Sequence, residues 1–215
     1  MEKEIKYIAV EGVIGAGKTT LAAKLAEKLN AKLILEQFED NPFLGSFYSD
    51  RKRFAFQTQM FFLINRFKQQ EELVQDNLFV DFTVSDYLLE KDRIFAYMNL
   101  SGEELKLYEA VFPLLQKNLR QPDLVVYLQS TVERLMQNIR SRDRSVEKNI
   151  TKSYIVELND AYNHFFFRYS STPLLIVNAA EIDFVKNPEH YKELEKAIFR
   201  EERGMVEYFQ PERAE

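Results

Sequence analysis

The residues with the clearest chemical meaning form the run Gly12-Val13-Ile14-Gly15-Ala16-Gly17-Lys18-Thr19-Thr20, which fits the pattern G-x-x-x-x-G-K-[ST]. Glycines at these spacings let the backbone turn tightly and point its N–H groups at phosphate oxygens, and Lys18 can reach the β- and γ-phosphates. The hydroxyl of Thr19 can bind Mg²⁺, and a helix that opens at Lys18 would direct its positive dipole end at the phosphates. The motif therefore predicts a site for a nucleoside triphosphate and Mg²⁺, formed by Gly12, Gly15, Ala16, Gly17, Lys18, Thr19 and Thr20.

Two carboxylates follow predicted strands. Glu36 ends a short apolar run at 32–35, and Asp86 follows a strand predicted at 78–84. In parallel α/β sheets, ligands bind beyond the carboxyl ends of the strands. Glu36 could there accept a proton from an attacking hydroxyl, although a solvated glutamate at a strand end fits its position as well. Asp86 stands where a phosphate-loop enzyme has an acid that directs Mg²⁺, so Thr19 and Asp86 are the predicted metal residues.

Two further groups of polar residues could bind a nucleotide. Gln59 lies on a helix predicted at 52–75 and could pair with a base edge through its amide, although a lone glutamine on a helix is more often a surface residue. Arg140, Arg142 and Arg144 follow at every second position after a helix predicted at 131–139. Planar guanidinium groups suit phosphates that are being transferred, and the alternative is a solvated charged face.

The elements that must position these residues alternate along the chain. Strands are predicted at 5–10, 32–35, 78–84, 123–128 and 174–177. Helices are predicted at 18–29, 52–75, 88–98, 102–119, 131–139, 152–169 and 188–207, with a turn and short helix at 42–49. Strand, crossover helix and strand indicate a parallel α/β fold. The 52–75 helix is apolar on more than one face, so we expect core, substrate pocket or a second subunit to cover it.

Composition narrows the class of protein. The chain has 215 residues, which fits a single domain over 1–215, and its formal charge of −5 argues against a nucleic-acid partner. It contains no cysteine, so disulfide and thiol chemistry are excluded. Its apolar runs are too short for a membrane span, and the charged N-terminus does not resemble a signal peptide. We therefore expect a cytoplasmic enzyme without a membrane partner.

Taken together, these pieces resemble the deoxynucleoside kinase family, within the nucleoside- and nucleotide-kinase-like phosphate-loop fold. The resemblance runs from the phosphate loop to about Phe167, and the short bacterial deoxyadenosine, deoxyguanosine and deoxycytidine kinases are the most similar group. Besides the loop, five features carry the resemblance. Glu36 is followed by Asn41-Pro42-Phe43, and Tyr48 precedes the run Arg53-Phe54-Ala55-Phe56-Gln57-Thr58-Gln59. The other three features are Arg66, the run Asp92-Arg93-Ile94-Phe95-Ala96 and the pattern Arg142-x-Arg144-x-x-Glu147.

The resemblance implies a role for each matching position. Glu36 would be the general base toward the sugar 5′-hydroxyl, and Lys18 would act on the phosphates of ATP. On the nucleoside side, Gln59 would bind the base, with Arg66 and Asp92 supporting Gln59. Phe54 and Phe95 would form the walls of the base pocket. Tyr48 and Glu147 would bind the 3′-hydroxyl. Arg142 and Arg144 would close over the phosphates as part of a lid at about 140–150. The family also implies a three-layer α/β/α fold with a five-stranded parallel sheet, and a homodimer.

The chain departs from the family at one motif. Familiar members have Glu-Arg-Ser or Asp-Arg-Ser after the third strand, whereas this chain has Ser85-Asp86-Tyr87. The arginine that the resemblance would place on both the phosphates and the general base is missing. Arg140 or the lid pair could replace it, and Asp86 is expected to act on Mg²⁺ through water.

The predicted activity is transfer of the γ-phosphoryl group of ATP to the 5′-hydroxyl of a deoxyribonucleoside, with deoxyadenosine favoured and deoxyguanosine or deoxycytidine as alternatives. A thymidylate-type monophosphate kinase is a second hypothesis, but it would need basic residues for the phosphate of the acceptor. A nucleotide-dependent switch is a third. A GTPase would have D-x-x-G after the third strand and N-K-x-D later, and the sequence contains neither.

Overall fold

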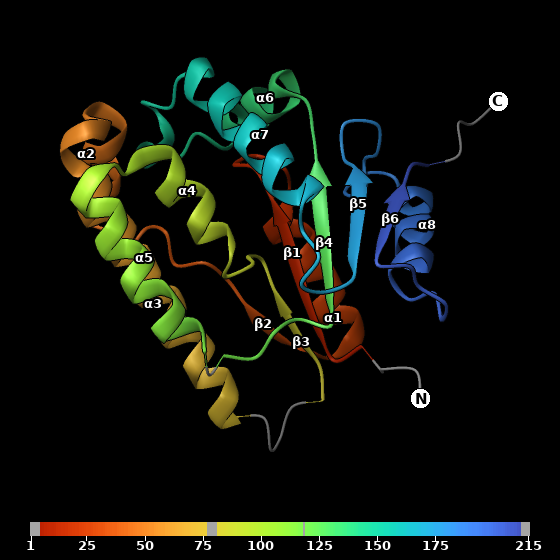
Figure 1. Cartoon of the computed structure of the whole chain (residues 1–215). Coiled ribbons are helices and arrows are strands. Elements are labelled where there is room, and N and C mark those ends of the chain that lie inside the picture. Colours follow the sequence, from red (N-terminus) through yellow and green to blue (C-terminus); the bar gives the residue numbers. More distant parts are fainter. Residues whose placement is uncertain (1–4, 77–80, 118, 212–215) are drawn as a thin grey trace.

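The computed structural model describes residues 5–76, 81–117 and 119–211. Within these ranges, six parallel strands form one sheet in the order β2-β3-β1-β4-β5-β6 (Figure 1). The strands are β1 (Tyr7–Gly12), β2 (Lys32–Ile34), β3 (Thr83–Ser85), β4 (Leu124–Gln129), β5 (Leu174–Asn178) and β6 (Val206–Phe209). The helices are α1 (Lys18–Leu29), α2 (Leu44–Ser49), α3 (Arg51–Asp76), α4 (Lys91–Asn99), α5 (Gly102–Gln116), α6 (Val132–Arg142), the 3-10 turn η1 (Ser145–Glu147), α7 (Lys152–Phe167) and α8 (Pro188–Ile198).

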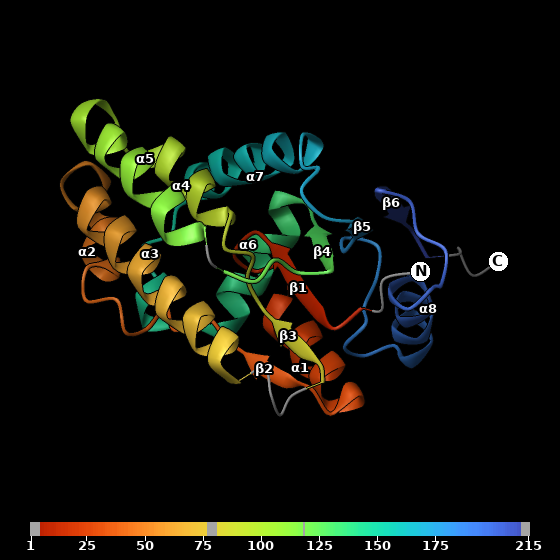
Figure 2. The same ribbon diagram turned by 60° about the horizontal axis from the view of Figure 1, so that its bottom comes forward.

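Helices cover both faces of the sheet, which confirms the predicted three-layer α/β/α architecture. Helices α1 and α8 lie on one face, and α4 and α7 lie on the other with α3 and α5 beyond them (Figures 1 and 2). The ring of Tyr127 on β4 stacks on Phe166 of α7 with centroids 4.1 Å apart. All six residues of β1 are buried. A strand that is covered on both faces needs a nearly continuous apolar sequence, and the 123–128 run has one.

The sheet has one strand more than predicted. A helix was expected over 188–207, but α8 ends at Ile198, where Arg203 donates hydrogen bonds to the carbonyl oxygens of Ala197 and Ile198. Residues after Gly204 instead continue the sheet, and β6 pairs in parallel with β5 from Val206 to Phe209. The expectation of a five-stranded sheet was therefore wrong. Amphipathic spacing alone did not reveal the helix end, because β6 is a half-exposed edge strand with a weak apolar pattern.

The long helix and the third strand also differ in detail from expectation. Helix α3 packs against α2, α4 and α5, and Leu63 is fully buried there. The core and the pocket described below therefore account for its apolar composition, which gives no separate support for a subunit interface. Strand β3 begins at Thr83, whereas residues 78–80 of the predicted strand lie outside the described residues. In the part of the chain that the structure describes, no helix is both long and apolar enough to cross a membrane.

Candidate active site

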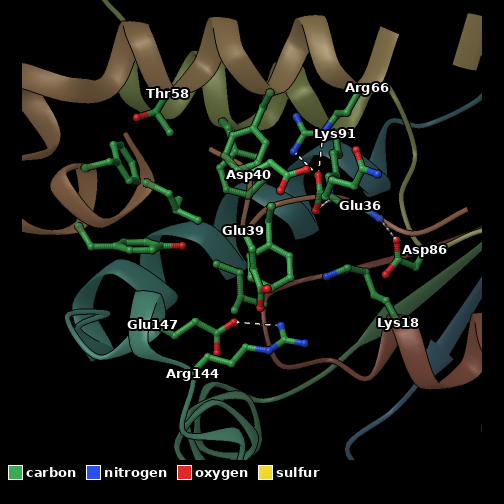
Figure 3. Close-up of a pocket in the computed structure, with 18 of the residues that line it drawn as sticks. Lys18, Glu36, Glu39, Asp40, Thr58, Arg66, Asp86, Lys91, Arg144 and Glu147 are labelled. Carbon is green, nitrogen blue, oxygen red and sulfur yellow. Dashed lines mark hydrogen bonds and ion pairs between the residues drawn. The ribbon is translucent and has the colours of Figure 1, made fainter. Parts of the chain in front are cut away.

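A cavity of about 500 Å³ lies at the carboxyl ends of β1, β2 and β3 (Figure 3). Its walls include the phosphate loop after β1, Glu36 after β2 and Asp86 after β3. One face of α3 forms another wall, and residues around η1 form the side that we call the lid. The volume is within the range of small-molecule sites, which is about 300–1,000 Å³. The parallel sheet thus brings together side chains that are far apart in the sequence.

The phosphate loop has the conformation that its glycines predict. Gly15 and Gly17 have φ values of 91° and 97°, which are left-handed conformations that favour glycine. A Cβ atom on Gly15 would lie 2.7 Å from the carbonyl oxygen of Leu135, and one on Gly12 would lie 2.8 Å from that of Leu128. Helix α1 begins at Lys18, directly after the loop. The N–H groups of this turn and the start of the helix can therefore bind an anion.

The polar side chains at the end of the loop differ in whether they line the cavity. The ammonium group of Lys18 donates to the carbonyl oxygens of Gly12 at 2.7 Å and Val13 at 3.3 Å. Burial lowers the pKa of Lys18, and the positive charge of Lys91 lowers it further. The predicted nucleotide residue Thr20 is exposed on α1 and does not line the cavity, whereas Thr19 does. Lys18 and Thr19 are thus the polar loop side chains that line the cavity, beside the apolar Ile14.

Thr19 and Asp86 form the pair predicted for Mg²⁺. The hydroxyl of Thr19 donates to Oδ2 of Asp86 at 2.6 Å, and the Glu36 backbone N–H donates to Oδ1 of Asp86 at 2.7 Å. In the described residues, no three histidine, cysteine or acidic side chains are grouped as a metal site. Mg²⁺ usually takes only one or two protein oxygens and fills its shell with phosphates and waters, so a hydroxyl beside one carboxylate fits this ion.

Two cations hold the carboxylate of Glu36. Oε1 accepts hydrogen bonds from Nε of Arg66 at 2.7 Å and from its Nη2 at 2.5 Å. Oε2 accepts one from Nζ of Lys91 at 2.7 Å (Figure 3). Burial alone would raise the pKa of Glu36, but the charges of Arg66 and Lys91 outweigh burial and hold the pKa far below its usual range. Glu36 is therefore an ionised carboxylate that lies beside the phosphate loop.

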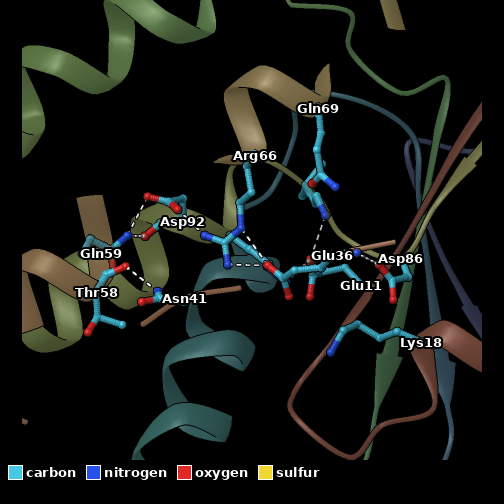
Figure 4. Close-up of polar contacts among 12 residues, drawn as sticks. Glu11, Lys18, Glu36, Asn41, Thr58, Gln59, Arg66, Gln69, Asp86 and Asp92 are labelled. Atoms are coloured by element: carbon cyan, nitrogen blue, oxygen red, sulfur yellow. Dashed lines mark hydrogen bonds and ion pairs between the residues drawn. The ribbon is translucent and has the colours of Figure 1, made fainter. Parts of the chain in front are cut away.

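The amide of Gln59 is oriented by Asp92. Its nitrogen donates to Oδ1 of Asp92 at 2.6 Å and to the Asp92 carbonyl oxygen at 2.9 Å, while Asp92 also pairs with Nη1 of Arg66 (Figure 4). Both partners of the amide nitrogen are acceptors, so the reversed orientation would place oxygen against oxygen. Gln59 thus has its nitrogen occupied and retains Oε1 as an acceptor. Asp92 is fully buried and does not line the cavity.

Positions at helical spacing on α3 line the cavity. They are Ala55, Thr58, Gln59, Phe62 and Arg66. The predicted base wall Phe54 is one position away from this face, and one residue corresponds to about 100° of rotation around a helix. Its ring contacts the guanidinium of Arg53 and does not line the cavity, so the cavity gives its assignment as a wall no support. Phe95 does line the cavity, where its ring meets that of Tyr162 edge to face.

The lid side of the cavity holds Tyr48, Glu147 and two arginines. Glu147 is buried on η1 and lies 3.5 Å from Nη1 of Arg144 and 3.9 Å from Nη2 of Arg142. Its Oε2 has no hydrogen-bond partner among the described residues. Burial raises the pKa of Tyr48 well above its usual value, so its hydroxyl stays protonated. Arg142 and Arg144 line the cavity, whereas Arg140 is exposed and does not.

Several residues of the site were missed in the sequence, among them Lys91, Glu11 and the cavity-lining acids Glu39 and Asp40. Lys91 begins α4, is buried, and contacts Glu36. Glu11 is fully buried before the loop and accepts hydrogen bonds from the backbone N–H groups of Gly12 and Leu88. The position of Lys91, immediately before the Asp92-Arg93 pair and shortly after the third strand, was an available signal. A lysine on an expected helix is too common on surfaces for that signal to stand out.

Comparisons with known proteins agree with this geometry. The family model described as "Deoxynucleoside kinase" matches residues 8–202. A deoxyguanosine kinase of Bacillus subtilis (strain 168) is 36% identical over 193 residues, which cover 87% of this chain and 93% of the relative. A deoxyadenosine kinase of Dictyostelium discoideum is 35% identical and is matched over 93% of this chain and 81% of its own. A solved structure of deoxyadenosine kinase from M. mycoides with bound dATP has a TM-score of 0.78 and 26% identity, and the match covers 90% of this chain and 98% of that one. The chain belongs to the deoxynucleoside kinase family.

Proposed function

We propose that this protein transfers the γ-phosphoryl group of ATP to the 5′-hydroxyl of a deoxyribonucleoside. The observation that carries the proposal is the position of Glu36. It is an ionised carboxylate beside Lys18 and Asp86, at the junction between the phosphate loop and a cavity. Aromatic and neutral polar groups line this cavity together with charged ones, which include the acids Glu39 and Asp40 in addition to the lid arginines. Such a junction suits a donor phosphate on one side and an uncharged acceptor on the other. The family of the chain supports the same reaction.

Each end of the cavity has its own task in this reaction. The loop N–H groups and Lys18 hold the β- and γ-phosphates, and Arg142 and Arg144 reach over them from the lid. Thr19 and Asp86 would hold Mg²⁺, which neutralises charge on the phosphate oxygens when it is bound. A bond forms between the acceptor 5′-oxygen and the γ-phosphorus while the bond from phosphorus to the β–γ bridging oxygen breaks, so ADP leaves. The proton of the hydroxyl passes to Glu36.

The strongly lowered pKa of Glu36 sets when that proton moves. A carboxylate with so low a pKa is a weak base toward a neutral alcohol. Once the oxygen has bonded to phosphorus its proton becomes acidic, and transfer to Glu36 is then favourable. Before that step, Glu36 acts mainly by orienting the hydroxyl through a hydrogen bond. Positioning of this kind is the main source of catalysis in phosphoryl transfer.

The orientation of Gln59 favours an adenine base. Because its amide nitrogen is used by Asp92, Gln59 offers the base an acceptor, Oε1. Adenine carries an amino group at position 6, which donates, whereas guanine carries an oxygen there, which accepts. Cytosine also carries an amino group and is the next candidate. Deoxyadenosine is therefore the proposed preferred acceptor, even though the relatives include deoxyguanosine kinases.

A phosphorylation screen tests the reaction and the acceptor. The four deoxynucleosides and their four monophosphates are each incubated with the protein, ATP and Mg²⁺, and the products are separated by chromatography. We expect deoxyadenosine to be converted to its monophosphate fastest. Activity on monophosphates alone would instead establish a thymidylate-type kinase. Hydrolysis of nucleoside triphosphate with no acceptor requirement would favour a switch protein.

We also propose a homodimer, formed by the outer faces of α4 and α7. Large apolar side chains are exposed on this surface, including Tyr97, Val156 and Phe167. Between these helices lies a second hollow of about 580 Å³, lined in part by Ile94, Met98 and Phe165. Exposed apolar surface on packed helices often marks an interface between proteins. A second copy of the same chain could cover both features.

A further inference from the structure

Lys91 has a position that the family resemblance did not predict. It is the first residue of α4 and only 2% exposed, yet it lines the cavity. Its ammonium group lies 2.7 Å from Oε2 of Glu36 and 3.9 Å from Oε2 of Glu11. Figure 3 shows it beside Arg66 and Glu36, at the junction between the acceptor part of the cavity and the phosphate loop. A buried lysine needs such partners, because an unpaired buried charge is very costly.

Neutralising Glu11 does not explain this lysine. Glu11 already accepts hydrogen bonds from the N–H groups of Gly12 at 2.9 Å and Leu88 at 2.7 Å, and from the hydroxyl of Tyr162 at 3.2 Å. Glu36, likewise, has a second cation on its other oxygen. An ammonium group has three N–H donors, and Lys91 uses one of them in hydrogen bonds with the described residues. Donors therefore remain for a ligand in the cavity.

The position of the missing arginine also suggests that Lys91 contacts a ligand in the cavity. Where familiar members have an arginine after the third strand, this chain has Tyr87, whose side chain is fully buried. The ammonium of Lys91 lies 5.8 Å from the centre of the Tyr87 ring. The three arginines considered from the sequence do not contact Glu36. Arg140 is exposed outside the cavity, and Arg142 and Arg144 pair with Glu147 on the lid.

We propose that Lys91 supplies the cation that this motif lacks: it holds Glu36 toward the acceptor hydroxyl and contacts an oxygen of the phosphoryl group during transfer. This proposal rests on the proposed kinase function. The transferring group carries negative charge on three oxygens, and a preorganised cation at that point stabilises the transition state more than the ground state. Lys91 and Lys18 would approach the group from α4 and from the loop, respectively. The terminal N–H groups of one lysine can contact both Glu36 and the phosphoryl oxygen.

The test compares Lys91→Met and Lys91→Arg with the wild type, and uses Lys106→Met as a matched control. Lys106 is an exposed lysine of α5 that forms an ion pair with Glu103. Loss of one transition-state donor lowers kcat by about 10²–10³-fold, so we expect this loss in Lys91→Met while KM for deoxynucleoside and ATP stays within about threefold. Lys91→Arg, which keeps the charge, should recover at least about tenfold of kcat over Lys91→Met. Lys106→Met should match the wild type.

The pH dependence separates this role from a structural one. Lys91 is one of the charges that lower the pKa of Glu36, so the acid limb of the kcat profile should move to higher pH in Lys91→Met. Circular dichroism and thermal melting report whether each variant folds. If Lys91→Met does not fold, Lys91→Gln, which keeps a donor without a charge, is measured in the same way.

The experiment distinguishes a failure of the Lys91 proposal from a failure of the proposed kinase function. A folded Lys91→Met or Lys91→Gln with kcat within about threefold of the wild type overturns the proposal, as does a loss confined to KM. A wild-type protein that phosphorylates no deoxynucleoside in the same assay overturns the kinase function instead. The reduced kcat with unchanged KM, the partial recovery by arginine and the shifted acid limb together support it.

Discussion

The carboxylate of Glu36 is bound so tightly by its neighbours that its chemistry depends on them. Arg66 contacts one oxygen and Lys91 the other, and Arg66 is itself held by Asp92. Asp92 in turn fixes the amide of Gln59, which faces the nucleoside part of the cavity. A continuous set of charge-assisted hydrogen bonds therefore links the proposed base-reading residue to the proposed general base. Such a network holds both groups in one geometry before the acceptor binds.

Replacing Glu36 should remove turnover and leave nucleotide binding. In Glu36→Gln the side chain keeps its shape but loses its basicity, and loss of a general base lowers kcat by about 10²–10⁴-fold. ATP binding, measured by calorimetry, should remain because the phosphate loop is unchanged. Glu103→Gln makes the same chemical change at an exposed position of α5, and its kcat should stay within about threefold of the wild type. Near-normal turnover in Glu36→Gln would exclude the general-base assignment.

The pKa of Glu36 also predicts how its ion pairs depend on pH. The folded-state pKa lies below the value of about 4.3 expected in the unfolded chain, so the unfolded state binds more protons at acid pH. The stabilisation from Glu36 is thus fully present above about pH 5.5 and is lost progressively as the pH falls below about 4.3. Urea unfolding of the wild type and of Glu36→Gln across this pH range measures the stabilisation that Glu36 contributes. The difference between their free energies of unfolding should shrink on acidification, and a difference that stays constant or grows would contradict the assignment.

The phosphate loop is the element in which sequence and geometry agree most closely. Gly15 is restricted twice, by its positive φ and by the carbonyl oxygen of Leu135 on α6. The loop is joined to the same helix by a hydrogen bond of 2.8 Å from the amide of Asn138 to the Gly15 carbonyl oxygen. The loop and the helix that leads to the lid therefore share one packed contact. A substitution at Gly15 should therefore alter the packing of both the loop and α6.

Alanine substitutions at two glycines test this restriction. Gly15→Ala should lower the free energy of unfolding by about 1–3 kcal/mol, because alanine is strained at positive φ, and should also weaken ATP binding. Gly45 lies in α2, and a Cβ atom there would meet no neighbouring group within 4 Å, so Gly45→Ala should raise stability by about 0.4–1 kcal/mol. Denaturant unfolding measures both changes. Equal effects at the two positions would show that the loop tolerates a side chain.

The sequence predicted those parts of the site that depend on local patterns. The phosphate loop, the strand ends that carry Glu36 and Asp86, and the parallel order of strands and helices follow from spacing over a few residues. The sequence did not show that Phe54 lies off the cavity face of α3, because one residue along a helix changes the face that a side chain occupies. Strand β6 was missed because an edge strand is stabilised by pairing with β5, a contact that the local sequence does not encode. Lys91 was missed for the same kind of reason, since its partner Glu36 is distant in the sequence.

The proposed active site and the proposed dimer interface lie on different parts of the molecule. The cavity residues that we assign to phosphates, acceptor and metal lie at the carboxyl ends of β1, β2 and β3, on α3 and on the lid. The outer faces of α4 and α7, by contrast, present apolar groups away from the cavity. A homodimer through these faces would place the interface away from the cavity residues. Association should therefore affect stability more than the chemical step.

A charge on the α7 surface tests this assembly. Phe167 is 81% exposed at the end of α7, and an aspartate there would introduce a charge into the proposed apolar interface. We expect sedimentation analysis to give a dimer for the wild type and a monomer for Phe167→Asp, with kcat within about threefold because the cavity is unchanged. Leu114→Asp places the same charge on an exposed apolar position of α5, outside the proposed interface, and should remain dimeric. A monomeric wild type would rule out the dimer. Dissociation by both variants would move the interface toward α5, and dissociation by Leu114→Asp alone would place it there instead of on α4 and α7.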